Sequence, residues 1–278
     1  MARQTGDNHH ILLVGAGKMG GALVDAWLTR KIIQSSDIVL VEPDIARAKH
    51  FRETYSLQTF ETLEAVNTGI GQPIVVFAIK PQVMDAVVPL YRDLAQQGSL
   101  ILSIAAGKTL DYFEGILGAN SPIVRAMPNT PASIGKGMTA LCSNDHVNSK
   151  QKTLCQKLVS AVGKVRWIEN EQLMDPVTAV SGSGPAYVFL LIEVLAEAGF
   201  KAGLDQDLAN ELAVTTVAGA AALAEESTLS PSTLRQNVTS PGGTTEAALT
   251  VLMSNDRLSD LFLQAVNKAV TRSRELAG

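Results

Sequence analysis

The sequence contains little charge, few aromatic side chains and only two cysteines. Of its 278 residues, 18% are charged, 5% are aromatic and 46% are hydrophobic. Disordered chains are richer in charge and poorer in apolar residues, so this composition excludes them. Cys142 and Cys155 are too few for a disulfide-built miniprotein. The net charge of −4 gives no general electrostatic footprint for nucleic acid, so we expect no such partner.

The sequence also lacks a recognisable targeting or membrane-spanning segment. Residues 1–10 are polar and have no apolar core of the kind that a signal peptide needs. No run of about 18 uncharged apolar residues occurs, so we expect no membrane-spanning helix and no membrane partner. The simplest prediction is a cytoplasmic protein with reduced thiols. We interpret the His9-His10 pair as a solvated tail, with a stray metal site as the alternative.

Histidine is scarce, and none of the four histidines follows residue 146. No spacing of His, Cys and carboxylate residues fits a metal site, and no serine triad with a nucleophile elbow is present. An enzyme that oxidises an alcohol usually needs a positioned base such as His or Lys. Reduction of an imine needs less, because a protonated C=N bond is already electrophilic. The absence of histidine after residue 146 therefore favours imine reduction over alcohol oxidation.

Short apolar runs in the N-terminal half of the chain end in glycine, proline or a lysine-proline pair. Such runs predict buried strands, and helical patterns at 22–30 and 45–55 follow the first two. Strands that alternate with helices predict a Rossmann-type, doubly wound parallel sheet. We assign residues 1–168 to this dinucleotide-binding α/β domain. The strand-like runs are 11–14, 38–41, 73–79, 100–104 and 123–127.

The pattern changes near residues 165–172, and no convincing strand follows Asp175. Alanine-rich helical segments take over, and Asp205 and Ser230 are good N-caps for two of them. We therefore assign residues 169–278 to an all-α domain that follows the α/β domain. The predicted helices are 185–202, 206–226, 232–238, 244–253 and 257–274.

The first part of the helical half is unusually poor in charge. Only six of the residues from Pro176 to Leu223 are charged, and the segment 212–223 is apolar or small on every side. A helix of this kind is buried all round. A second copy of the chain, packed against the helical domain, would cover this surface. The alternative is a single core helix in a monomer.

Residues 15–20 read Gly-Ala-Gly-Lys-Met-Gly, between a predicted strand and a predicted helix. In that context the glycines allow a tight turn, close approach to a pyrophosphate and close packing of helix on strand. The helix N-terminus offers N–H groups to the phosphates. The motif therefore predicts dinucleotide binding, and the alternative is an ordinary glycine-rich turn.

The second strand ends at Val41-Glu42-Pro43-Asp44, where Rossmann-type domains contact the adenosine ribose. A carboxylate at Glu42 can accept hydrogen bonds from both ribose hydroxyls and would repel a 2′-phosphate, which favours NADH over NADPH. Arg47 and Lys49 follow closely and could reach a phosphate, and Glu42 could also be a solvated loop acid.

Three further segments follow predicted strands, at 78–82, 103–107 and 127–131. Ligand crevices of open α/β sheets are built from the carboxyl ends of strands, so three segments at one edge favour a cofactor cleft. Asn129 has the donors and the acceptor for a carboxamide or a ribose. Each segment alone could be a plain strand-ending turn.

Two loops in the helical half, 181–185 and 239–245, combine hydroxyls and glycine before a predicted helix. Such helix N-termini suit a carboxylate ligand, although two good N-caps would look the same.

The chain resembles the Δ1-pyrroline-5-carboxylate reductases over roughly residues 11–275. The specific part is the 239–245 loop (TSPGGTT) after 234–238 (LRQNV), together with 179–187 (AVSGSGPAY). The segments GAGKMGGAL, AIKPQ, SIAAG and RAMPNTPA and the terminal residues 271–276 add to the resemblance.

The resemblance implies the last step of proline synthesis, in which NADPH or NADH reduces the C=N bond of 1-pyrroline-5-carboxylate to give L-proline. The Thr245 hydroxyl would face the imine nitrogen as proton donor or orienter. The loop would hold the substrate carboxylate and ring through Ser240, Gly242, Gly243, Thr244 and Thr245. The pyrophosphate would contact Gly15, Gly17, Lys18, Met19 and Gly20. Other cofactor contacts would be Ala78, Lys80, Pro81, Ala105, Ala106, Asn129 and, from the helical domain, Asn237.

The resemblance also implies an interlocked homodimer through the helical domain, and further assembly into a decamer of five dimers. Two departures from the family pattern stand out. Glu42-Pro43-Asp44 replaces the usual Ser or Asn with a nearby basic residue, which puts the habitual NADPH preference in doubt. Met253 stands where an acid or amide is common, and we expect that change to be structural.

Two other functions fit parts of the pattern. A β-hydroxyacid dehydrogenase of similar layout would need a lysine base after the domain boundary, and Lys201 is a poor candidate at a helix end. A dinucleotide-sensing protein without turnover would be expected to have damaged substrate loops, and both loops look intact.

Overall fold

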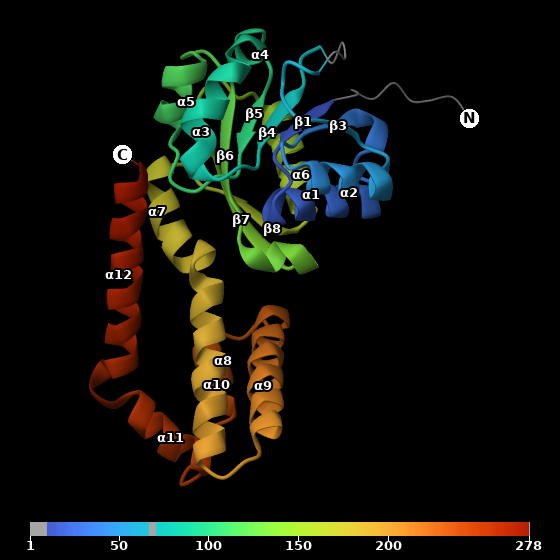
Figure 1. Cartoon of the computed structure of the whole chain (residues 1–278). Helices are drawn as coiled ribbons and strands as arrows, with labels where there is room; N and C mark the ends of the chain where they lie inside the picture. The colour runs from blue at the N-terminus through green and yellow to red at the C-terminus, as the bar shows by residue number, and fades with distance from the viewer. Residues whose placement is uncertain (1–9, 67–70, 278) are drawn as a thin grey trace. The chain divides into compact units, whose positions relative to one another are not determined.

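The computed structural model describes residues 10–66 and 71–277, which form two compact units (Figure 1). We call residues 10–182 and 270–277 the sheet unit, and residues 183–269 the helical unit. His9 and most of the predicted polar tail lie outside the described residues.

The sheet unit extends further along the chain than the predicted domain boundary at residue 168. Met174 and Ala179 are fully buried, and Met174 belongs to a core cluster of the sheet. Asp175 accepts a hydrogen bond of 2.7 Å from the Ser273 hydroxyl, which ties the end of the chain to the same unit. The compact units therefore change at Gly182 and again at Val270, because these segments bury their apolar side chains and pair their polar ones within the sheet unit.

Among the described residues, the sheet has eight strands in the order β3-β2-β1-β4-β5-β6-β7-β8, and only the β6–β7 pair is antiparallel. Helices lie between β1 and β2, β2 and β3, β4 and β5, β5 and β6, and β7 and β8, as the crossovers of a doubly wound sheet require. The strands are β1 (Ile11–Val14), β2 (Ile38–Val41), β3 (Gln58–Phe60), β4 (Ile74–Phe77), β5 (Ile101–Ser103), β6 (Ile123–Met127), β7 (Gly137–Ser143) and β8 (Gly163–Trp167).

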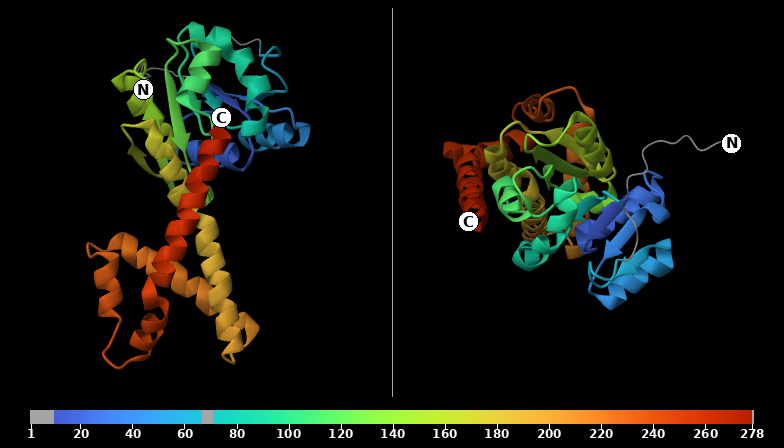
Figure 2. Two further views of the ribbon diagram at one scale, coloured as in Figure 1. Left: turned by 90° about the vertical axis from the view of Figure 1, so that its left-hand side faces the viewer. Right: turned by 90° about the horizontal axis from the view of Figure 1, so that it is seen from above.

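Helices cover both faces of the sheet, as Figures 1 and 2 show. Buried residues of α1, α2 and α6 form the core on one face, and those of α3 and α5 contribute to the core on the other. The helices are α1 (Lys18–Thr29), α2 (Ile45–Tyr55), α3 (Met84–Val87), α4 (Arg92–Gln96), α5 (Leu110–Leu117), α6 (Ser149–Ser160) and α7 (Met174–Val177).

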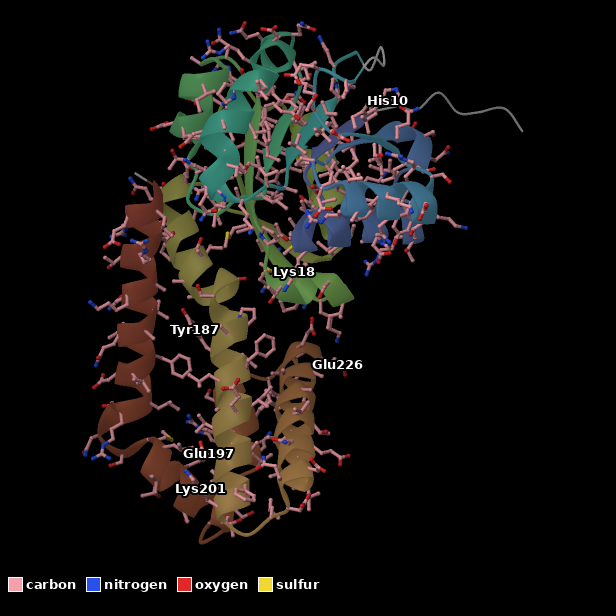
Figure 3. All side chains as sticks on the ribbon, in the orientation of Figure 1. His10, Lys18, Tyr187, Glu197, Lys201 and Glu226 are labelled. Atoms are coloured by element: carbon pink, nitrogen blue, oxygen red, sulfur yellow. The ribbon has the colours of Figure 1, made fainter. Side chains whose placement is uncertain are left out.

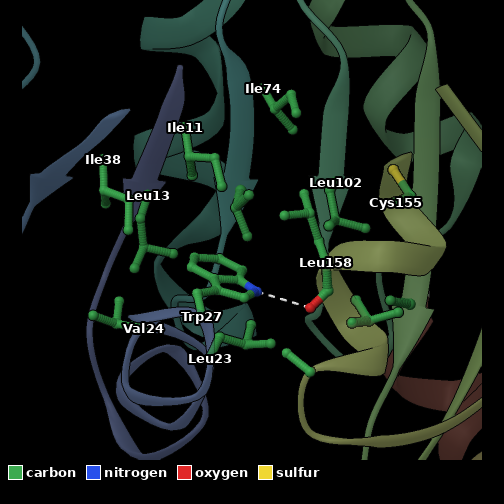
Figure 4. Packing of buried hydrophobic residues seen from close by; sticks show 14 of the residues in the cluster. Ile11, Leu13, Leu23, Val24, Trp27, Ile38, Ile74, Leu102, Cys155 and Leu158 are labelled. Carbon is green, nitrogen blue, oxygen red and sulfur yellow. Dashed lines mark hydrogen bonds between the residues drawn. The ribbon is translucent and has the colours of Figure 1, made fainter. Parts of the chain in front are cut away.

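Each core is organised around large aromatic side chains. Trp27 is fully buried, and its indole N–H donates a 2.8 Å hydrogen bond to the Leu158 carbonyl (Figure 4). On the other face, the Phe77 ring meets Tyr91 edge-on at 5.1 Å and stacks on Phe113 at 6.1 Å. The five apolar runs predicted as strands form β1, β2, β4, β5 and β6, so that prediction is confirmed.

The other strands carry weak sequence signals, which is why they were not predicted. β3 has three residues, of which Gln58 is exposed. β8 lies at the opposite edge and alternates half-buried residues with the exposed Lys164 and Arg166. β7 contains Gly137 and Thr139 and pairs antiparallel with β6, so it does not continue the run of parallel strands that the sequence predicts.

The helical unit contains only helices among its described residues, as the sequence predicts. Asp205 accepts from the backbone N–H groups of Asp207 and Leu208, and Ser230 accepts from that of Thr233, so both predicted N-caps are confirmed. The helices are α8 (Gly184–Lys201), α9 (Gln206–Glu226), α10 (Pro231–Asn237), α11 (Thr244–Leu252) and α12 (Arg257–Ala277), whose last turns belong to the sheet unit.

The helical unit buries very little of its apolar surface within one chain. Its only buried hydrophobic residues are Ala196, Ala209 and Ala213, whereas Phe189 and Leu190 are 57% and 58% exposed. The segment 171–201 is long and apolar enough to cross a membrane by length and composition alone. The sequence count missed this segment because it considered only uninterrupted apolar runs, and the expectation of no membrane-spanning helix stays a prediction. A helix that another subunit covers meets the same criterion.

Candidate functional site

The glycine-rich loop joins β1 to α1, and its three motif glycines have different physical roles. Gly15 has a φ of +87°, and a Cβ there would lie 2.6 Å from the Ile79 Cγ2 atom. A Cβ at Gly20 would lie 2.5 Å from the Gly15 carbonyl oxygen. A Cβ at Gly17, by contrast, would meet nothing within 4 Å. The outer glycines are therefore required by the turn and by packing, while Gly17 leaves its backbone open to a ligand.

The N-terminus of α1 is suited to an anion. Gly17 is its N-cap and provides no side-chain cap, and the first turn contains no acidic residue. The positive end of the helix dipole is therefore not neutralised by the helix itself. Lys18 is exposed at this end of α1 (Figure 3), and Met19 packs against the core. The loop fits the pyrophosphate of a dinucleotide.

The strand ends meet at one edge in register. Val14 pairs with Val41 on one side and with Phe77 on the other, so the residues that follow β1, β2 and β4 lie side by side. Gly15, Glu42 and Ala78 are these next residues. The strand ends that the sequence brings together are therefore adjacent in the sheet unit, and cofactor binding at this edge stays a prediction.

Glu42 is almost completely buried, with 3% exposure, so the alternative of a solvated loop acid is wrong. Its Oε2 accepts 2.8 Å from the backbone N–H of Ala16 in the glycine-rich loop, and 3.2 Å from Arg47. Its Oε1 accepts 3.0 Å from the backbone N–H of Asp44. The carboxylate is thus held by protein donors, and a contact with ribose stays a prediction.

The ends of β4 and β5 supply small or exposed residues to the same edge. After β4, Ala78 is half-buried, and the exposed Lys80 caps a turn that begins at Pro81. After β5, Ala105 is buried and Ala106 is half-buried. Ala105 packs in a core cluster, so an approach of a flat ring to the backbone at these positions stays a prediction.

Asn129 follows β6 and is engaged by the protein rather than left open. Its Oδ1 accepts 2.9 Å from the Met138 backbone N–H, and its Nδ2 donates to the carbonyl and hydroxyl oxygens of Ser181 at 3.2 and 3.3 Å. Asn129 therefore fixes the segment that precedes α8, and its contact with a cofactor stays a prediction.

The predicted loop at 181–185 is helical instead. Thr178–Gly182 is a π-helical turn, and Ser183 has right-handed helical geometry without a side-chain cap bond, so this segment is not an N-cap loop. A Cβ at Gly182 would lie 2.5 Å from the Met127 Cε atom, the far end of a flexible side chain. π-helical turns are frequent at functional sites.

The predicted substrate loop lies in the helical unit, between α10 and α11. Gly242 has a φ of +71°, and its backbone N–H donates 2.8 Å to Glu246 Oε2. Gly243 is the N-cap of α11 without a side-chain cap bond, and a Cβ there would lie 2.9 Å from the Ser240 carbonyl oxygen. The loop is therefore a built turn that leads into a helix N-terminus.

The predicted substrate residues form a group of their own at this turn. Thr244 and Thr245 open α11, Thr245 is half-buried, and Asn237 ends α10. This group belongs to the helical unit, whereas the other predicted cofactor residues belong to the sheet unit. The acid at Glu246 was not predicted; its position in the first turn, four residues after Gly242, is a detectable capping signal.

Other candidate chemistry is weak in the described part of the chain. No group of three or more His, Cys, Asp or Glu residues there could hold a metal ion. Burial raises the pKa of the Cys142 and Cys155 thiols to about 12, so neither is poised to react. Lys201 is exposed on α8 and pairs with Glu197 at 2.5 Å (Figure 3), which does not describe a buried catalytic base.

Comparison with known proteins agrees with this geometry. The family model "Pyrroline-5-carboxylate reductase dimerisation" matches residues 171–276, and "NADP oxidoreductase coenzyme F420-dependent" matches residues 10–107. The pyrroline-5-carboxylate reductase of Pseudomonas aeruginosa is 39% identical over 268 residues, which cover 96% of each chain. The chain belongs to the pyrroline-5-carboxylate reductase family. The family member from Synechocystis is also 39% identical, over 265 residues.

Solved pyrroline-5-carboxylate reductases have the same fold. The structure from Coxiella burnetii superposes with a TM-score of 0.90 at 37% identity and covers 98% of this chain and 100% of that one. The Plasmodium falciparum reductase, which was solved with NADP bound, gives 0.83 at 30% identity and covers 98% and 99%. A prephenate dehydrogenase from A. aeolicus gives 0.55 at 14% identity and shares only the fold.

Proposed function

We propose that this chain is an NAD(P)H-dependent oxidoreductase that reduces the C=N bond of 1-pyrroline-5-carboxylate to L-proline, the last step of proline biosynthesis. One observation carries the proposal: the similarity to pyrroline-5-carboxylate reductases covers both units, with 96% of each chain aligned to the relative from Pseudomonas aeruginosa. The reduced nicotinamide supplies the hydride. The chain's own residues bind the cofactor, hold the substrate and manage the proton.

The glycine-rich loop is the proposed pyrophosphate site. The open backbone at Gly17 and the uncapped N-terminus of α1 supply N–H donors, with Lys18 adding positive charge. Other proposed cofactor contacts are Gly15, Met19, Gly20, Glu42, Ala78, Lys80, Pro81, Ala105, Ala106, Asn129 and Asn237.

The 239–245 loop is the proposed substrate site. The N-terminus of α11 at Gly243 and Thr244 would hold the substrate carboxylate, with Ser240 and Gly242 completing the turn. The Thr245 Oγ1–H group would donate a hydrogen bond to the substrate nitrogen as hydride reaches the C=N carbon and a lone pair develops on that nitrogen. Orientation by these groups, rather than a strong base, is the chemistry that imine reduction needs.

The assembly follows from the exposed apolar surface of the helical unit. The dimerisation family model covers this unit, and a homodimer would bury Phe189, Leu190 and their neighbours. We propose that dimers assemble further into a decamer of five dimers, and that the enzyme is cytoplasmic.

A spectrophotometric assay tests the proposed reaction. Oxidation of NADH or NADPH is followed by the loss of absorbance of the reduced nicotinamide with 1-pyrroline-5-carboxylate as substrate, and proline is quantified as product. We expect turnover with at least one cofactor. Absence of proline formation with both cofactors would contradict the proposal.

A further inference from the structure

An acid after the second strand of a Rossmann-type domain is expected to select the cofactor by binding its ribose. In this chain Glu42 is also the centre of a network of hydrogen bonds within the protein. Each carboxylate oxygen has two acceptor positions. Oε2 uses both, for the Ala16 N–H and for Arg47 Nη1, and Oε1 uses one, for the Asp44 N–H. One acceptor position therefore remains for a ribose hydroxyl on a side chain that is 4% exposed.

Arg47 is held by two acids at once. Its Nη1 lies 3.2 Å from Glu42 Oε2, and its Nη2 lies 3.3 Å from Asp44 Oδ2. Asp44 also caps α2, because its Oδ1 accepts 3.0 Å from the Arg47 backbone N–H. The Arg47 and Asp44 side chains are 43% and 46% exposed, so this pair, and not Glu42, meets the solvent after β2.

The charges of this cluster oppose a phosphate. Glu42 and Asp44 contribute two negative charges and Arg47 one positive charge, and the guanidinium donors that face the acids are occupied. To pair with Arg47, a 2′-phosphate would have to break the ion pair between Arg47 and Asp44. The phosphate would then lie beside the unpaired Asp44 carboxylate. Such an unfavourable juxtaposition of like charges is an effective way to reject a near-identical ligand.

We propose that Asp44, by holding Arg47, is the residue that makes this site select NADH over NADPH, and that Glu42 is a positioning residue that anchors the glycine-rich loop through Ala16. This inference rests on the proposed use of a nicotinamide dinucleotide. According to this proposal, Arg47 can bind a 2′-phosphate once the exposed carboxylate of Asp44 is removed.

The test uses calorimetric binding of NADH and NADPH to the full-length protein without a second substrate. Asp44→Ser keeps an N-cap oxygen for α2 but removes the charge. We expect the unmodified protein to bind NADH about tenfold more tightly than NADPH, and Asp44→Ser to reduce this ratio by about fivefold. Asp205→Ser is the matched control: it changes an N-cap aspartate of α9 in the same way and should leave the ratio unchanged.

A double substitution shows whether the gain in NADPH affinity of Asp44→Ser depends on Arg47. In Asp44→Ser/Arg47→Ala, the improvement in NADPH affinity should disappear, because the released guanidinium is gone. A ratio that does not move in Asp44→Ser, a gain that persists without Arg47, or a protein that prefers NADPH at the outset would overturn the inference. Failure of the proposed reaction would appear separately, as dinucleotide binding without proline formation.

The positioning role of Glu42 has its own readout. Glu42→Gln replaces one carboxylate oxygen by an amide N–H₂ group, so either the Asp44 N–H on Oε1 or the Ala16 N–H and Arg47 on Oε2 lose their acceptor. We expect NADH affinity to fall about tenfold in protein that is still folded. A residue with only a structural role would lower the unfolding midpoint and leave the dissociation constant unchanged, which would overturn this part.

Discussion

The two units of this chain differ in how they bury apolar side chains. The sheet unit has complete cores on both faces of its sheet, with Trp27, Phe77 and Phe113 fully buried. The helical unit buries three alanines and exposes most of its large apolar residues. The first unit carries its stability within one subunit, whereas the second needs a partner surface to exclude water. A family model for dimerisation matches the residues that need it.

The largest expected effect is in the core of the sheet unit. Trp27→Ala removes a fully buried indole and its hydrogen bond to Leu158, and should reduce the free energy of unfolding by about 3–5 kcal/mol. Urea denaturation followed by circular dichroism measures it. A loss below about 1 kcal/mol would contradict the packing around this side chain.

The second test asks whether a partner covers the helical unit. Phe189 is 57% exposed in one chain, so Phe189→Asp should be tolerated by a monomer. In a dimer it buries an unpaired charge, and we expect dissociation, with the dimer affinity lowered by roughly two orders of magnitude. Sedimentation velocity over a dilution series measures the change. Glu193→Asp, also on α8, is the control, and an unaltered dimer in Phe189→Asp would place the interface elsewhere.

A smaller effect is expected at the proposed catalytic hydroxyl. Thr245→Ala should lower kcat by about tenfold or more, because a hydrogen bond to the reacting nitrogen is lost in the transition state. Thr245→Ser retains the hydroxyl and should keep most of the activity. Steady-state kinetics with 1-pyrroline-5-carboxylate measures both variants, and equal kcat values for Ala and Thr would remove Thr245 from the mechanism.

The smallest effect concerns the acid that supports the substrate loop. Glu246→Gln keeps an acceptor for the Gly242 N–H but removes a negative charge near the proposed carboxylate site. We expect the KM for 1-pyrroline-5-carboxylate to fall by about twofold with kcat unchanged. Glu246→Ala removes the acceptor as well and should raise KM. Identical KM values for the two variants would show that the hydrogen bond does not order the loop.

The sequence predicted the fold class and the family, because both depend on local patterns. The buried runs of β1, β2, β4, β5 and β6 and the N-caps Asp205 and Ser230 are visible without tertiary information. β7 and β8 are not, since a strand with Thr139 or with the exposed Arg166 is stabilised by its neighbours rather than by its own pattern.

The candidate site was predictable in composition but not in detail. The motif identifies the glycines, yet only the structure separates Gly17, which is open, from Gly15, which is required by its φ and by Ile79. The burial of Glu42 depends on a hydrogen bond to a residue 26 positions earlier in the chain. Long-range side-chain contacts of this kind leave no periodic signal.

The chain enters the sheet unit twice, and this has a consequence for how the protein is made. Residues 270–277 complete the sheet unit, with Ser273 bound to Asp175 and Leu276 packed 3.3 Å from the position of a Cβ at Gly107. A nascent chain therefore carries an unfinished first unit until residues 270–277 have been synthesised. The helical unit is made in the interval, with its apolar surface exposed. A chain that stops before residue 270 would thus lack the Ser273 and Leu276 contacts of the sheet unit while the apolar surface of its helical unit is already exposed.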